Sequence, residues 1–137
     1  MANVLQKPEI WAIITFRIGA AIPQGILRSL YVFLFWVPMK IISGIEIYPQ
    51  TKIGEKLYII HHGGIFIDPR TVIGNNCILL NNVNIGTRFD GKGAPVIGDN
   101  VRIGAGAKII GAVNIGDDAT IEANAVVTKD VPAGAIW

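Results

Sequence analysis

The sequence is poor in cysteine and in charge. Its 137 residues include one cysteine, Cys77, so no disulfide can form within the chain, and no partner residues stand near it at metal-ligand spacing. This usage fits a reducing compartment, and we expect a cytoplasmic protein. Charged residues make up 16% of the chain, with a net charge of +2 and no basic run. The chain therefore lacks the positive field typical of nucleic-acid binding, which we exclude as a function.

Long apolar runs are scarce as well. The strongest candidate for a membrane segment, residues 30–37, follows Arg28 and precedes Pro38 and Lys40, and it is too short to span a bilayer. No secretory signal is recognisable near the start, where Lys7 to Glu9 come first. The run leaves a peripheral membrane contact open, although packing against the rest of the protein or a neighbouring subunit is the simpler expectation.

What the chain does contain is apolar side chains, 51% in all, which is too many for a disordered protein. The pattern of apolar residues divides the chain into a helical segment over residues 1–44 and a second domain over residues 45–137. The helical part is interrupted at Pro23–Gly25, and Pro38 predicts a kink in its second half. Its first half carries one apolar group: Ile10, Ile13, Ile14, Phe16 and Ile18.

The second domain has an internal repeat of six residues. Aliphatic residues recur at this spacing in two runs: Ile67, Ile73, Leu79, Ile85; then Ile97, Ile103, Ile109, Ile115, Ile121, Val127. A period of six is neither helical nor a simple strand alternation, and it predicts a β-solenoid whose corners bring aliphatic side chains into columns. An earlier run (Ile47, Ile53, Ile59, Ile65) is out of phase by two residues, which predicts a small insertion near Gly63–Gly64. Residues 86–96 suit an extruded loop.

Residues 46–131 resemble the hexapeptide-repeat acyltransferases, within them the serine O-acetyltransferase branch and its relatives in polysaccharide gene clusters. The resemblance is carried by these strings: IEIYP at 45–49, IG at 53–54, HHGGI at 61–65, IGAGAKIIG at 103–111 and NAVVTKDVP at 124–132. It implies a mainly β fold, a left-handed parallel β-helix with a short N-terminal helical segment. It also implies a homotrimer, acetyl-CoA as the donor and an active site between subunits.

Transfer of an acetyl group to a hydroxyl needs a base, and histidine suits this role near neutral pH. The chain has two histidines, and the family's catalytic histidine matches His61. The family's partner aspartate lies fifteen residues earlier, where this chain has Glu46, which would orient the imidazole and stabilise its protonated form. His62 is interpreted as structural or substrate-facing. A solvated histidine and a solvated turn carboxylate are the alternatives for these positions.

The family lays CoA along the cleft between two β-helices, and the resemblance matches Gly86, Ala105 and Ala123 to backbone positions that contact it. Small residues there would let the pantetheine arm approach the backbone closely. Lys108 and Lys129 are candidates for binding the CoA phosphates, Lys129 being the one we retain. Cys77 occupies a small-residue position of the repeat and is expected to fill the core. We expect no metal and no cofactor beyond acetyl-CoA.

The departures from the family concern the acceptor. Serine acetyltransferases have an Asp before the catalytic His and an Arg-His pair in the extruded loop, whereas this chain has Ile60 and Gly93–Ala94. These residues cannot pair with the charges of an amino acid. We therefore favour a hydroxyl of a sugar or polysaccharide precursor as the small-molecule acceptor, with serine O-acetylation in cysteine biosynthesis as the alternative.

A second class of function stays open, a β-solenoid scaffold without chemistry. A zinc enzyme on the same fold is disfavoured because His61 and His62 are adjacent and cannot readily supply two ligands. An isolated solenoid also needs a cap on its first end, which the helices could provide. Burial of its flat apolar sides in a trimer would create three clefts.

Overall fold

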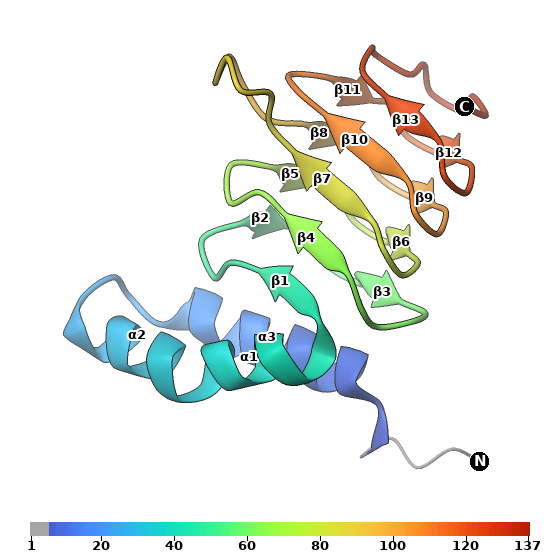
Figure 1. Ribbon diagram of the computed structural model, residues 1–137. Helices are drawn as coiled ribbons and strands as arrows, with labels where there is room; N and C mark the ends of the chain where they lie inside the picture. Colours follow the sequence, from blue (N-terminus) through green and yellow to red (C-terminus); the bar gives the residue numbers. More distant parts are fainter. Residues whose placement is uncertain (1–5) are drawn as a thin grey trace.

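The computed structural model describes residues 6–137 and consists of a helical layer at one end of a stack of short strands (Figure 1). The helices are α1 (Pro8–Ala21), α2 (Ile26–Tyr31), the π-helix η2 (Val32–Trp36) and α3 (Val37–Ser43). The strands follow in this order: β1 (Ile45–Ile47), β2 (Lys52–Ile53), β3 (Tyr58–Ile59), β4 (Ile65–Ile67), β5 (Val72–Ile73), β6 (Ile78–Leu79), β7 (Asn84–Gly86), β8 (Val96–Ile97), β9 (Arg102–Ile103), β10 (Lys108–Ile110), β11 (Asn114–Ile115), β12 (Thr120–Ile121) and β13 (Val126–Val127).

The strands form three parallel sheets, and successive strands lie in different sheets. Their orders are β1-β4-β7-β10-β13, β2-β5-β8-β11 and β3-β6-β9-β12. Each turn of the chain therefore adds one strand to every sheet, which gives four complete turns. Isolated bridges at Val131 and Ile136 continue the coil beyond β13. The predicted mainly β fold, a parallel β-helix preceded by a short helical segment, is confirmed.

The six-residue aliphatic positions form the core. Side chains such as Ile67, Leu79 and Ile103 are fully buried inside the coil. Cys77 is also fully buried, and its Sγ donates to the carbonyl of Gly98 at 3.2 Å. Burial raises the pKa of this thiol, so the thiolate needed of a nucleophile is disfavoured. The interpretation of Cys77 as a core residue agrees with this placement.

The corners between strands depend on residues that tolerate a left-handed backbone. Asn76, Asn100 and Asp118 stack on successive turns with φ of 59°, 59° and 60°. Their side chains form a ladder, because the Asn76 amide donates to Asn100 at 2.9 Å and the Asn100 amide donates to Asp118 at 3.1 Å. Asn and Asp adopt this conformation more readily than other side chains with a Cβ. The polar residues of the repeat therefore turn the chain.

Strand register locates the two interruptions that the repeat predicts. Phe66 pairs with Asn84, eighteen residues further on, which is the basic length of a turn. Ile45 pairs with Ile65, twenty residues on, so this turn carries two extra residues. The two extra residues lie in the segment between β3 and β4, and this segment contains the predicted insertion near Gly63–Gly64. Asn84 pairs with Lys108, twenty-four residues on, and the six extra residues form the predicted loop before β8.

The helical layer covers the first turn of the solenoid (Figure 1). The Arg17 guanidinium donates to the carbonyls of Ile53, at 2.8 Å, and Gly54. The Trp36 indole donates to the carbonyl of Ile47 at 2.7 Å. These donors satisfy carbonyls at the open end of the stack, where the sheets could otherwise add another strand. The expected cap is thus present.

The buried side of α1 differs from its apolar group. Ile14 and Ile18 are 40% and 49% exposed, whereas Glu9, Ala12, Phe16 and Gly19 are buried. The Tyr31 ring packs closely against Gly19, since a Cβ at this position would lie about 3.0 Å from the ring. The helix approaches its neighbours along its small residues, which turns part of the isoleucine group towards solvent.

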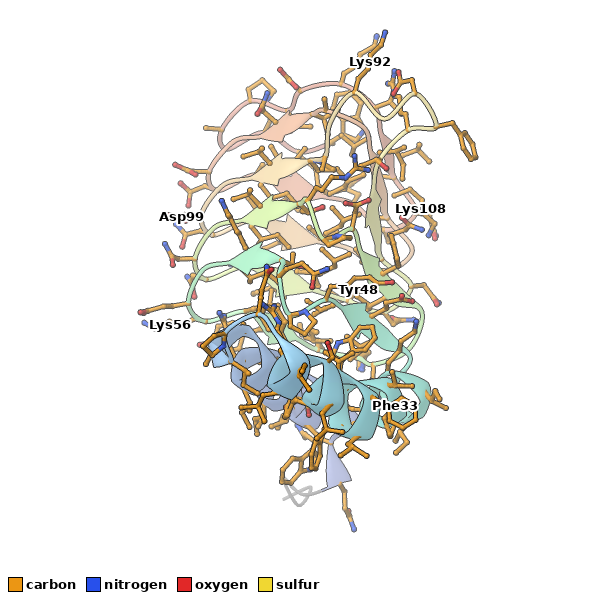
Figure 2. All side chains as sticks on the ribbon, turned by 90° about the vertical axis from the view of Figure 1, so that its left-hand side faces the viewer. Phe33, Tyr48, Lys56, Lys92, Asp99 and Lys108 are labelled. Carbon is orange, nitrogen blue, oxygen red and sulfur yellow. The ribbon has the colours of Figure 1, made fainter. Side chains whose placement is uncertain are left out.

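Residues 26–43 form one continuous helical stretch of 18 residues. Arg28 and Lys40 lie within it rather than bounding it, and Pro38 does not end it because the widened π-helical turn of η2 directly precedes this proline. The expectation from the shorter run at 30–37 is therefore corrected: by length and composition alone this stretch could cross a membrane, with mean hydropathy 1.5 and 11% of its residues buried. Phe33 projects outward from the helical layer (Figure 2).

Candidate active site

The site begins at the enlarged corner between β3 and β4, residues 60–64. Gly63 and Gly64 have φ of 99° and 66°, and a side chain on Gly64 would overlap the Asn82 amide of the next turn. Two glycines thus let a longer corner stack closely on a shorter one. His61 lies at this corner and is exposed. Among residues 6–137, no hydrogen bond or ion pair holds its imidazole, which leaves both ring nitrogens accessible.

Glu46 lies at the centre of β1 and faces outward, since Ile45 and Ile47 point into the core. Its Oε1 lies 2.8 Å from Nζ of Lys40 and accepts a hydrogen bond from the Tyr48 hydroxyl. Burial alone would raise the pKa of Glu46, but the hydrogen bonds from Lys40 and Tyr48 and the Lys40 charge outweigh it and lower this pKa. The pKa of Tyr48 is raised to about 12, first by its hydrogen bond to Glu46, then by burial and by the negative charges of Glu46 and Asp68.

The structure does not join His61 to Glu46 within the described chain. The carboxylate is occupied by Lys40 and Tyr48, whereas the imidazole is open to solvent. The pairing of these two residues stays a prediction, and it requires the Glu46 side chain to exchange at least one of its present partners.

The other histidine has a carboxylate partner that the sequence did not indicate. His62 Nδ1 lies 3.3 Å from Oε2 of Glu9, which comes from the first turn of α1. Glu9 is 8% exposed. The only local feature of Glu9 was that it is an acid at the start of a predicted helix. This is common, because the helix dipole stabilises an acid there, and it does not indicate a histidine partner.

Three predicted site residues share one edge of the solenoid. Counting two residues beyond the paired positions of β3, β6, β9 and β12 brings His61 into line with Asn81 on the next turn and with Ala105 and Ala123 on the two turns after it. Ala105 is half-buried and Ala123 is exposed, and neither carries more than a methyl group. This edge therefore carries the half-buried Asn81 directly above the histidine and only methyl groups on the two turns beyond it.

Gly86 is the last residue of β7 on the outer face of the β1-containing sheet, at the end of this sheet farther from the His61 corner. A Cβ at this position would lie 3.2 Å from the Asn84 side-chain oxygen and 3.9 Å from Phe66 and Ile110. Gly86 is buried between these larger neighbours. A pantetheine arm could contact this backbone only if the neighbouring side chains moved aside, and the CoA contact of Gly86 stays a prediction.

The two lysines differ in availability. Lys108 donates to the carbonyls of Asn82, at 2.9 Å, and Gly106, at 2.8 Å, so its ammonium is already used. Lys129 is exposed and follows β13, at the opposite end of this sheet from His61. It lies near the extruded loop, because the Arg88 guanidinium donates to the carbonyl of Thr128 at 2.9 Å. The structure thus places Lys129 at the same end of the sheet as Gly86 and separates both from His61, Ala105 and Ala123 by the width of the sheet.

The extruded loop reaches the end of the solenoid farther from the helices, where Lys92 lies near its tip (Figure 2). Arg88 and Lys92 line a small pocket of about 230 Å³ with Thr128. Asp90 lines the pocket as well, so the pocket carries two cations and one carboxylate, and none of these residues was predicted as a site residue from the sequence. The sequence feature that could have pointed to Arg88 and Lys92 was their presence together in the extruded loop.

A further cluster joins the second turn to the base of this loop. The Asp68 carboxylate accepts hydrogen bonds from the Arg70 backbone at 2.9 Å and its guanidinium at 3.2 Å, and from Thr87 at 3.4 Å. Burial would raise the pKa of Asp68, but the bonds from Arg70 and Thr87 and the Arg70 charge lower it. The cluster fixes the loop base. Across residues 6–137, no group of three His, Cys, Asp or Glu residues is arranged to hold a metal ion.

Comparison with known proteins places this geometry in a class. Residues 94–129 match the bacterial transferase hexapeptide (six repeats) family. The serine acetyltransferase of Helicobacter pylori is 38% identical over 136 residues, which cover 96% of this chain and 78% of that protein. The chain belongs to the hexapeptide-repeat acyltransferases, in the serine acetyltransferase family.

Solved structures agree with this assignment. The serine acetyltransferase of Neisseria gonorrhoeae in complex with serine has a TM-score of 0.83 and 32% identity, covering 96% of this chain and 54% of that one. A serine acetyltransferase in complex with CoA has a TM-score of 0.81 and 32% identity, covering 91% and 52%. The chain spans about half the length of these solved relatives, and the match includes the helical layer as well as the solenoid.

Proposed function

We propose that the protein is an acetyl-CoA-dependent O-acetyltransferase with His61 as its general base. The observation that carries this proposal is the position of His61, exposed at an enlarged corner, with Asn81 in line above it and Ala105 and Ala123 on the next two turns of the same edge. A base with free ring nitrogens beside an edge that ends in two alanines suits a thioester donor and a small hydroxyl acceptor. The CoA complex of a relative supports acetyl-CoA as that donor.

The reaction is a direct transfer. The acceptor oxygen attacks the acetyl carbonyl carbon while His61 removes the hydroxyl proton, so a C–O bond forms as the proton moves to the imidazole. The C–S bond then breaks, and the imidazolium returns its proton to the CoA thiolate. Glu46 would stabilise the imidazolium if its carboxylate turned towards His61. The proposed contacts of Gly86, Ala105 and Ala123 hold the donor, with Lys129 near its phosphates.

Serine is the acceptor we now favour over a sugar. The relatives named above are serine acetyltransferases, one of them in complex with serine, and this weighs more than the two local departures at Ile60 and Gly93–Ala94. Those departures argue only that the two charged groups of an amino acid would be bound by other residues. A sugar or polysaccharide precursor is the second candidate acceptor.

The assembly we propose is a cytoplasmic homotrimer with clefts between subunits, in which residues 1–44 cap the solenoid of residues 45–137. Each of the three sheets exposes an apolar side chain, Tyr58, Val96 or Val126, at 51%, 45% and 59%, and the subunit contacts of a trimer would bury those on the contacting faces. The apolar face of residues 26–43 supports a peripheral membrane contact as a further proposal. Sedimentation without vesicles measures the oligomeric state, and co-sedimentation with vesicles measures the membrane contact.

The proposed activity is tested by thiol release from acetyl-CoA, with L-serine and a panel of sugars offered separately. We expect release that depends on the acceptor and is fastest with serine. Faster release with a sugar would restore the sugar acceptor. A scaffold without chemistry is the remaining candidate, favoured by the occupied state of Glu46. No release with any acceptor and no CoA binding in calorimetry would establish it instead.

A further inference from the structure

The helical layer leaves most of one long apolar stretch uncovered. Residues 26–43 form 18 continuous helical residues, of which 11% are buried. The large apolar side chains that this stretch exposes form what we call the apolar face: Ile26, Leu27, Leu30, Phe33, Leu34, Phe35, Ile41 and Ile42. Soluble proteins seldom expose so many neighbouring apolar groups unless another surface covers them.

A small apolar pocket opens beside this face. It has a volume of about 180 Å³ and lies where the end of α1 meets α2 and η2. Its walls are entirely apolar or aromatic: Ile22, Leu27, Leu30, Tyr31, Leu34 and Phe35. The Tyr31 hydroxyl donates to the carbonyl of Thr15 at 2.9 Å, so its proton is already used. The pocket therefore suits a hydrocarbon chain better than a polar group.

Positive charge is concentrated in the same part of the chain. Residues 1–44 carry four basic side chains and one acidic one, a net charge of +3, whereas residues 45–137 carry eight basic and nine acidic ones, a net charge of −1. Arg17 and Arg28 form no ion pair among residues 6–137, so no carboxylate there neutralises them. A second copy of the helical layer would bring like charges together, whereas an anionic lipid surface would complement them.

The stretch cannot cross a bilayer without breaking its contacts with the solenoid. The Trp36 indole, near its middle, donates to the carbonyl of Ile47 at 2.7 Å. Nζ of Lys40 lies 2.8 Å from Oε1 of Glu46. A spanning helix would lose both contacts and would carry Arg28 and Lys40 towards the hydrocarbon, which is costly. A helix lying in the membrane plane keeps these contacts and inserts only its exposed side chains.

We propose that the apolar face lies in the plane of an anionic phospholipid surface, with Phe33 among the acyl chains and the pocket occupied by one of them. Phe33 is 71% exposed and projects outward from the helical layer (Figure 2). The inference rests on the peripheral membrane contact proposed above and names its lipid class and orientation. It is independent of the chemistry at His61, because lipid binding needs neither acetyl-CoA nor an acceptor. His61 belongs to the turn nearest the helical layer, so this contact would hold the proposed base close to the lipid surface.

The test is co-sedimentation of the full chain with vesicles of phosphatidylglycerol or of phosphatidylcholine, without acetyl-CoA. We expect binding to phosphatidylglycerol that weakens as salt is added, and weaker binding to phosphatidylcholine. Phe33→Asp should lower the partition constant for phosphatidylglycerol vesicles by about tenfold or more. Phe89→Asp is the matched control, because Phe89 is fully exposed in the extruded loop, away from the helical layer, and should leave this constant unchanged.

Several outcomes overturn the proposal. These are no binding to either vesicle, equal binding to both, or equal losses in Phe33→Asp and Phe89→Asp. Sedimentation velocity without vesicles tests the other occupant: an oligomer that Phe33→Asp dissociates and Phe89→Asp leaves intact would assign the apolar face to a second copy. If Phe33→Asp does not fold, Ile26→Asp takes its place, since Ile26 is 90% exposed. Thiol release measured on the same samples keeps the two proposals apart, because absent vesicle binding with unchanged release contradicts only the lipid contact.

Discussion

Nζ of Lys40 at the end of the helical layer lies 2.8 Å from Oε1 of Glu46 on the first strand. The ion pair joins α3 to β1 across Gly44, whose left-handed φ of 65° ends the helix. It therefore links the cap to the solenoid at the residue proposed to assist His61. Its charge keeps Glu46 ionised, which is the state an orienting carboxylate needs.

Replacement of Lys40 by Met should reduce the loss of folding stability that wild type shows as the pH falls below about 4.3. The lowered pKa of Glu46 contributes stability that is present above the unfolded-state pKa, about 4.3, and is lost as pH falls through the folded-state pKa. We expect Lys40→Met to cost about 1 kcal/mol or less at pH 7, since the pair is partly solvated. Urea denaturation from pH 7 to pH 3 checks this. A difference from wild type that grows as pH falls would contradict it.

The glycine at the histidine corner should be intolerant of a side chain. Gly64 and Gly91 have nearly equal φ, 66° and 65°, but a Cβ on Gly64 would overlap the Asn82 amide, whereas Gly91 has open space around it. We expect Gly91→Ala to cost about 1–2 kcal/mol from backbone strain alone. Gly64→Ala should cost more and should also lower kcat by displacing His61. Equal melting temperatures for the two variants would count against this packing.

The aliphatic columns should supply most of the stability of the solenoid. Ile103 is fully buried, whereas Val96 on an outward face is 45% exposed. We expect Ile103→Ala to lower the free energy of unfolding by about 2–5 kcal/mol and Val96→Ala by well under 1 kcal/mol. Chemical denaturation of both variants measures the contrast. Similar losses would mean that the six-residue positions are not the core.

Much of the solenoid could be predicted because its repeat is local. The spacing of Ile67, Ile73 and Leu79 sets the turn length, and the phase slip before Ile67 gives the two-residue insertion that the register confirms. Each of these features depends on residues close together in sequence. They could be read without knowledge of distant contacts.

The helical layer was harder to predict because its contacts are non-local. Glu9 and His62 meet only because α1 lies across the first turn, and nothing in either residue's neighbours specifies that approach. The same holds for Arg17, which reaches carbonyls thirty-six and thirty-seven residues away. Ile14 and Ile18 were grouped with Phe16 by spacing, yet the close approach at Gly19 decides which of them is buried.

The central claim is that His61 performs the chemistry, and a kinetic comparison of His61→Ala with wild type tests it most directly. Thiol release from acetyl-CoA with L-serine should fall by about 10²- to 10⁴-fold in kcat, the usual contribution of a general base. The Kd for CoA, measured by calorimetry, should be unchanged, because the donor contacts are proposed to lie on other residues. Release by His61→Ala at the wild-type rate would contradict the account.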